Sequence, residues 1–192
     1  MDDVRKHAPS PLVPVMTRLI NPIGFVLVSL IFLFMPCIAT SAESGPPRLK
    51  WIVDEGFTGW NIATEANTFP AAVRVLPFAL LVVLVAGAGT ALARSPQRRS
   101  FVAAVAATVS GGLLVVTGLW ASESLDVQGH EFLPMPSTMP PAEVAKFFDN
   151  LGIKVEVSVG FWLGLAALAV ITAFNVHLVL RSRRQPARAV PE

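Results

Sequence analysis

Charged residues are scarce in this 192-residue chain, because Asp, Glu, Lys and Arg together make up only 15% of it. Soluble domains average about 25%. Cysteine is scarce too: Cys37 stands alone, which rules out an intrachain disulfide and a Cys-based zinc site. Tyrosine is absent altogether. This shortage of polar surface excludes a disordered chain, a nucleic-acid-binding domain and an ordinary cytosolic enzyme, and it indicates an integral membrane protein.

Signatures of catalysis are lacking as well. The sequence holds no Gly-x-Ser-x-Gly, P-loop or dinucleotide fingerprint. His130-Glu131 is not followed by the second histidine of a zinc motif, and with Asp126 nearby it predicts weak metal binding at most. We therefore expect no catalytic residues, no metal site and no cofactor, and interpret the chain as a non-enzyme.

What the sequence does contain is four long apolar runs without Asp, Glu, Lys or Arg. About 20 helical residues cross a hydrocarbon core of roughly 30 Å, and a helix satisfies its own backbone hydrogen bonds in lipid. The runs predict membrane all-α architecture, a four-transmembrane-helix bundle. The predicted spans are residues 23–40, 75–93, 101–120 and 159–180.

The charges predict the orientation of this bundle. The tails 1–22 and 181–192 and the short loop 94–100 carry ten basic residues and three acids, whereas the loops 41–74 and 121–158 carry five basic residues and ten acids. The positive-inside rule places both termini in the cytoplasm of a multi-pass plasma (inner) membrane protein. Arginine outnumbers lysine by 11 to 4, a bias typical of GC-rich genomes that favours an actinobacterial source.

The first span has an alternative interpretation as a cleaved signal peptide, because Arg18 precedes an apolar run that ends near Thr40-Ser41-Ala42. We favour a retained span; Phe34-Met35-Pro36-Cys37 is a poor lipobox, because small residues are expected before its cysteine. Cleavage would leave the other three spans with the same orientation. Pro36 lies near its outer end and should kink or end the helix there.

The two outer loops predict a small extracytoplasmic β/α cap. In loop 41–74, residues 48–54 alternate like a strand and residues 56–62 could be the hairpin partner. In loop 121–158, residues 141–150 have the pattern of a short helix, and residues 153–159 alternate again. Strands from both loops could form one sheet above the bundle. Its aromatic side chains are candidate contacts for protein or lipid: Trp51, Trp60, Phe147 and Phe148.

Four spans, internal termini, a β-forming first loop with Trp51 and Gly59-Trp60, and a strand-like run before the last span resemble the claudin-type layout. The paired loop cysteines of that family are absent. The size and topology also resemble small four-helix accessory proteins of mycobacterial envelope machines, such as the one bound to the MCE lipid importer. This second resemblance implies an accessory role in lipid transport.

Small residues recur at four-residue spacing within the spans, which lets helix backbones approach closely. They form a candidate interface, either within the bundle or with a partner's transmembrane helix: Gly87, Ala103, Ala107, Gly111, Gly112, Gly160 and Gly164. A second stripe on the third span is Ala104, Thr108 and Gly112.

Asn175 and His177 are candidate intramembrane polar residues, either for structural hydrogen bonding or for a proton or ligand role. The sequence thus predicts an accessory or scaffold subunit of a bacterial cell-envelope complex, with membrane lipids and membrane proteins as partners and no nucleic acid. The alternative is a lipid-binding or small transport protein that acts alone or as a homo-oligomer.

Overall fold

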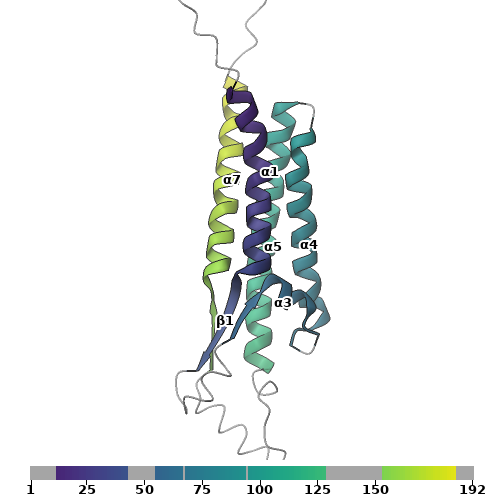
Figure 1. The fold of residues 1–192 in the computed structure, drawn as a ribbon, viewed down its shortest axis with the longest axis vertical. Helices are drawn as coiled ribbons and strands as arrows, with labels where there is room; N and C mark the ends of the chain where they lie inside the picture. Colours follow the sequence, from purple (N-terminus) through teal and green to yellow (C-terminus); the bar gives the residue numbers. More distant parts are fainter. Residues whose placement is uncertain (1–11, 43–54, 67, 94, 129–152, 185–192) are drawn as a thin grey trace, which may run out of the picture.

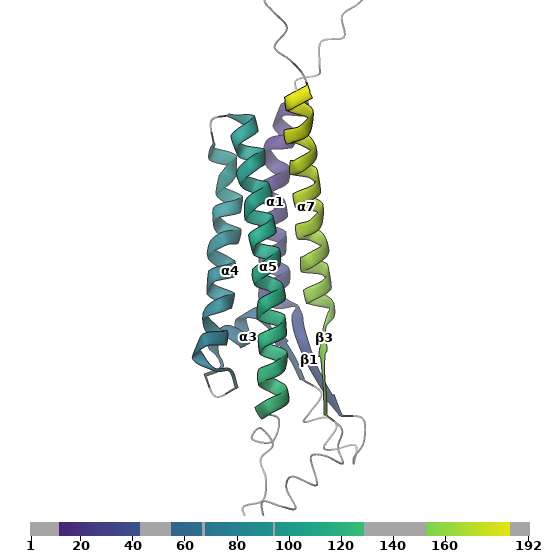
Figure 2. The same ribbon diagram turned by 180° about the vertical axis from the view of Figure 1, so that it is seen from behind.

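The computed structural model describes residues 12–42, 55–66, 68–93, 95–128 and 153–184. Long helices stand side by side in it, and a small sheet covers one end of the bundle, which we call the sheet end (Figure 1). The start of α1, the connection from α4 to α5 and the end of α7 lie at the opposite end (Figures 1 and 2). We call this the arginine end because it holds Arg98, Arg99 and Arg181.

Within the described residues, three helices are long and apolar enough to cross a membrane. They are α4 (Ala71–Gly89), α5 (Pro96–Gln128) and α7 (Val159–Arg184). They overlap the second, third and fourth predicted spans, but α4 begins and ends four residues earlier than predicted, and α5 continues to Gln128, so residues 121–128, expected as outer loop, are helical. A short 3-10 helix, η1 (Thr90–Leu92), follows α4. The described chain is therefore mostly helical, as a multi-pass membrane all-α protein requires.

The helix at the position of the first predicted span begins earlier and ends earlier than expected. α1 runs from Leu12 to Phe34. Its residues Leu19–Phe34 form an apolar stretch, about 24 Å long at 1.5 Å per residue. The helix ends because Pro36 has no N–H to continue it and disfavours helical geometry in the residue before it. Residues 36–40, expected as helix, belong to a strand.

The sheet joins strands from the two predicted outer loops to a central strand. β1 (Pro36–Ala42) pairs antiparallel with β2 (Glu55–Thr58) on one side and with β3 (Ile153–Val157) on the other. The register places Ile38 opposite both Phe57 and Val157. The alternating run before the last span is therefore a strand, as its pattern predicted.

The segment expected as the second hairpin strand, residues 56–62, is a strand only as far as Thr58. The helix α3 (Gly59–Thr64) follows, because Thr58 and Asn61 form a capping box. The amide N–H of Asn61 donates to Thr58 Oγ1 at 3.2 Å, and the amide N–H of Thr58 donates to Asn61 Oδ1 at 3.1 Å. Reciprocal capping of this kind starts a helix. The strand expected at 48–54 and the helix expected at 141–150 lie outside the described residues.

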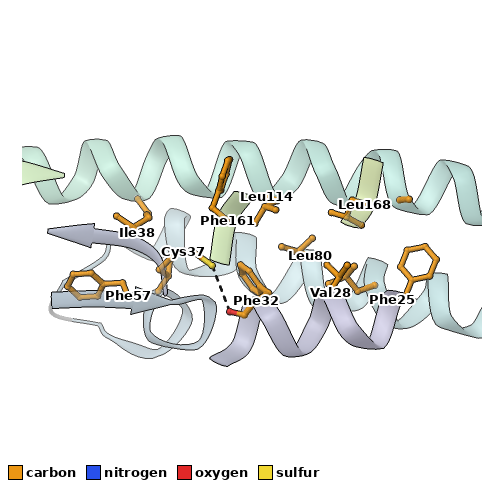
Figure 3. Packing of buried hydrophobic residues seen from close by; sticks show 14 of the residues in the cluster. Phe25, Val28, Phe32, Cys37, Ile38, Phe57, Leu80, Leu114, Phe161 and Leu168 are labelled. Carbon is orange, nitrogen blue, oxygen red and sulfur yellow. Dashed lines mark hydrogen bonds between the residues drawn. The ribbon is translucent and has the colours of Figure 1, made fainter. Parts of the chain in front are cut away.

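One continuous apolar core runs from the helices into the sheet (Figure 3). Phe25, Val28 and Phe32 form the buried face of α1 at helical spacing. Ile38 extends the core into β1, and Phe57 in β2 stacks edge-to-face on Phe69, with ring centroids 5.5 Å apart. The cap is therefore packed onto the bundle, and its position relative to the helix ends is fixed.

Candidate partner interface

The first stripe of small residues on α5 lies inside the bundle. Ala103 and Ala107 are buried, and a Cβ added to Gly111 would sit 3.9 Å from Leu165 Cδ1 of α7. Since these residues already touch the chain's own helices, they pack the bundle.

The glycines of α4 and α7 also face the chain itself. A Cβ on Gly160 would lie 2.6 Å from the Pro36 carbonyl oxygen, so α7 begins directly against the turn between α1 and β1. A Cβ on Gly164 would lie 3.3 Å from Leu114 Cδ2, and one on Gly87 would lie 2.6 Å from Phe25 Cε1. Each glycine therefore provides space for a neighbouring side chain or backbone.

The second stripe on α5 begins buried at Ala104 and is exposed at Thr108 and Gly112. Ala104 and Thr108 line a cavity of about 410 Å³ between α5 and α7, which we call the apolar groove. Thr108 Oγ1 donates to the Ala104 carbonyl at 2.9 Å, so its hydroxyl is satisfied within the helix. Gly112 continues the stripe one turn further, and a Cβ there would meet nothing within 4 Å. The full lining is Phe101, Ala104, Val105, Thr108, Val109, Val176, Val179 and Leu180.

The predicted intramembrane polar residues are not brought together. Asn175 is fully buried and pairs with Asn21 of α1. Asn21 Nδ2 donates to Asn175 Oδ1 at 2.9 Å, and Asn175 Nδ2 donates to Asn21 Oδ1 at 2.8 Å and to the Ile171 carbonyl at 2.8 Å. His177 is exposed on the opposite side of α7. The two residues therefore form no relay, and the amide pair joins α1 to α7.

Asn21 was not predicted as a bundle residue, because the predicted boundary placed it in the tail before the first span. The signal was present, because Asn21, Phe25, Val28 and Phe32 fall on one helical face. Extending the apolar face of α1 by one turn would have placed Asn21 among its buried residues.

Among the four aromatic residues predicted to form an outer contact, the structure describes Trp60. Its side chain is 54% exposed on α3, at the sheet end of the bundle. Trp51, Phe147 and Phe148 lie outside the described residues.

Cys37 is buried in β1 beside the last turn of α1 (Figure 3). Burial raises the pKa of its thiol from 9.0 to about 11, against a smaller opposing effect of a backbone hydrogen bond with Gly59. A thiol with such a pKa stays protonated at neutral pH, and the thiolate is the nucleophilic and metal-binding form. Cys37 therefore serves as a small apolar core residue.

In the part of the chain that the structure describes, no three His, Cys, Asp or Glu side chains lie close enough together to bind a metal ion. His130 and Glu131 lie outside it.

Arg99 is the second residue, after Asn21, that the sequence did not single out. It belongs to the first turns of α5 and is only 9% exposed. Its Nη2 donates to the Ala93 carbonyl at 2.7 Å, while its buried Nε has no hydrogen-bond partner. The sequence assigned Arg99 to the loop 94–100, whereas the structure places it in α5, where its contact with the Ala93 carbonyl accompanies its burial.

The described structure thus defines a mostly helical protein of the multi-pass membrane class, with three long apolar helices and a small sheet. Comparison with protein-family models, curated proteins and solved structures found no match for the chain. The resemblances to claudins and to mycobacterial accessory proteins remain predictions.

Proposed function

We propose that this chain is a non-enzymatic membrane subunit of a larger bacterial cell-envelope complex, and that it seats a partner's transmembrane helix in the apolar groove. The main support for this proposal is the apolar groove. Its walls are apolar, and the stripe from Ala104 to Gly112 provides the flat, small-residue surface on which a second helix backbone can approach closely.

The same proposal includes α1 as a fourth span and both termini in the cytoplasm. α1 contacts α4 and α7 along the bundle, as a fourth span of the same bundle would. Clustering of basic residues at the arginine end supports a cytoplasmic location for that end.

The role of the sheet in this proposal is to present a contact surface outside the membrane. Trp60 is exposed on a short helix that the capping box holds in place. Aromatic side chains of this kind are enriched at protein interfaces. The cap would contact extracytoplasmic parts of the complex. The resemblance to mycobacterial accessory proteins makes a lipid-transport system of the envelope the candidate complex.

The experiment is affinity purification of the C-terminally tagged protein from the native host in mild detergent, followed by mass spectrometry. A stoichiometric membrane-protein partner is expected. Gly112→Leu adds a bulky side chain to the small-residue stripe one turn beyond the groove lining and should reduce the recovered partner several-fold. Gly89→Leu is the matched control, since a Cβ there also meets nothing within 4 Å but Gly89 lies on α4. Recovery of a lone species, or equal partner recovery with both variants, would refute the proposal.

A second function has one observation in its favour: the groove lining would equally suit an acyl chain. In that alternative the protein handles lipid alone or as a homo-oligomer. The purified protein would then carry lipid above detergent controls, and Gly112→Leu would reduce that lipid without any partner being present.

A further inference from the structure

A second cavity lies at the arginine end, between the start of α5 and the end of α7. We call it the Arg99 pocket. Its volume is about 330 Å³, about eleven times the share of one water molecule in the liquid. Its lining is Pro96, Gln97, Arg99, Ser100, Leu178 and Ser182.

The pocket contains a buried positive charge that nothing in the described structure neutralises. Arg99 is 9% exposed and its Nε lacks a partner. Within residues 12–42, 55–66, 68–93, 95–128 and 153–184, no carboxylate lies at the arginine end. The described acids occupy β2, the end of α3, the sheet-end part of α5 and β3: Glu55, Glu65, Glu123, Asp126 and Glu156. A buried charge is costly unless an opposite charge accompanies it.

The start of α5 adds further attraction for an anion. Its first N–H groups have no helical carbonyl partners, and the helix dipole is positive there. Pro96 has no N–H, the Arg98 N–H donates to Ser95 Oγ at 3.3 Å, and the Arg99 N–H donates to the Ser95 carbonyl at 3.1 Å. The Gln97 N–H is therefore the donor left over in this first turn, and helix N-termini are common phosphate sites. Arg99 and the first residues of α5 line one cavity.

We propose that the Arg99 pocket binds the phosphate group of an anionic phospholipid. The apolar spans begin at Pro96 in α5 and end at Ser182 in α7, and both residues line the pocket. This is the depth at which lipid headgroups lie, and basic pockets between helices at that depth bind anionic headgroups. The proposal does not depend on a protein partner in the apolar groove.

The test is native mass spectrometry of the full chain released from detergent, with phosphatidylglycerol or phosphatidylcholine added. Wild type should retain phosphatidylglycerol in preference to phosphatidylcholine. Arg99→Gln should weaken retention by about tenfold, the factor that a hydrogen bond to a charged group typically contributes. Arg98→Gln, which removes the same charge from the exposed neighbour, should change it less than about twofold, as expected for an exposed charge in water.

Gln97→Glu keeps the test decisive if Arg99→Gln fails to fold. A glutamate in the first turn favours the helix dipole, yet it places a carboxylate at the pocket and should expel the phosphate. Retained phosphatidylglycerol in this variant would overturn the proposal. So would equal losses in Arg98→Gln and Arg99→Gln, which would indicate diffuse surface charge. Displacement of the lipid by millimolar inorganic phosphate would overturn the lipid assignment and identify a site for free phosphate.

Discussion

The amide pair between α1 and α7 allows a quantitative test of how this bundle is held together. Asn21 and Asn175 are 1% and 0% exposed, so neither side chain can turn to water while the bundle is folded. The perturbation is Asn→Leu at each position alone and at both together. Leucine keeps the branched shape of asparagine and removes its polar atoms, which limits the contribution of an empty cavity.

The two single variants should differ in free energy of unfolding. Asn175→Leu leaves Asn21 with neither of its two amide contacts, whereas Asn21→Leu leaves Asn175 its bond to the Ile171 carbonyl. An orphaned buried polar group costs about 1–3 kcal/mol, and an interhelical hydrogen bond in a membrane contributes roughly 0.6 to 2 kcal/mol. We expect losses of about 2–3 kcal/mol for Asn175→Leu and about 1–2 kcal/mol for Asn21→Leu.

The double variant gives the sharper result, because replacing both partners by apolar groups of similar shape is close to neutral. We expect it to lie within about 1 kcal/mol of wild type, and so to recover most of the two single losses. Reversible unfolding in bicelles measures all three, and His177→Leu serves as the control, because His177 is exposed on the same helix. A double variant as unstable as the sum of the single variants would refute the reasoning.

Three further predictions concern two glycines, the buried thiol and the cap of α3. Gly160→Ala should cost roughly 1–3 kcal/mol of stability, because its Cβ would meet the Pro36 carbonyl oxygen at 2.6 Å. Gly112→Ala, whose Cβ enters open space, should instead stabilise α5 by about 0.5–1 kcal/mol, and thermal unfolding in detergent that ranks the two variants the other way would contradict this. Cys37 should react slowly with maleimide at neutral pH, and its labelling rate should rise about tenfold per pH unit towards its pKa. Because burial raises that pKa from 9.0 to about 11, the folded state binds the thiol proton more tightly than the unfolded state, and the free energy of unfolding should fall as pH rises from 9 to 11. An unfolding midpoint that does not change over this pH range would argue against burial of the thiol. Thr58→Ala should cost about 1 kcal/mol through loss of the α3 cap, which the same unfolding assay would detect, and an unchanged midpoint would show that the cap contributes little.

Periodicity and charge-free length were enough to predict α4, α5 and α7, since a span needs only a continuous apolar run. The alternation at Ile153–Val157 was likewise enough to predict β3. Both signals are local, so each can be read from a single segment. Pro36 also acted as a local signal, and the helix ends at Phe34 as that proline required.

The errors arose where one local signal competed with another. Alternation at residues 56–62 suggested a strand, but the capping box of Thr58 and Asn61 starts α3. Which stripe of small residues faces the bundle could not be predicted, because Ala103 and Ala104 are neighbours with equal side chains. Only the packing of α5 against α7 assigns one stripe to the core and the other to the apolar groove.

The apolar groove and the Arg99 pocket share the seam between α5 and α7, but their linings have no residue in common. Arg99 and Thr108 are nine residues apart, which is about two and a half turns, so they project from opposite faces of α5. On α7, Leu178 lines the pocket and Leu180 lines the groove, and two residues also turn the helix by slightly more than half a revolution.

A helix in the groove and a phosphate in the pocket would therefore not compete for the same space. Two variants separate the sites. Gly112→Leu should reduce partner recovery and leave retention of phosphatidylglycerol unchanged, whereas Arg99→Gln should do the reverse. If either variant impaired both measurements while its unfolding midpoint stayed at the wild-type value, the two sites would have to be coupled through movement of α5 against α7. The contact between Gly164 and Leu114 at that seam would then be the first place to look for the coupling.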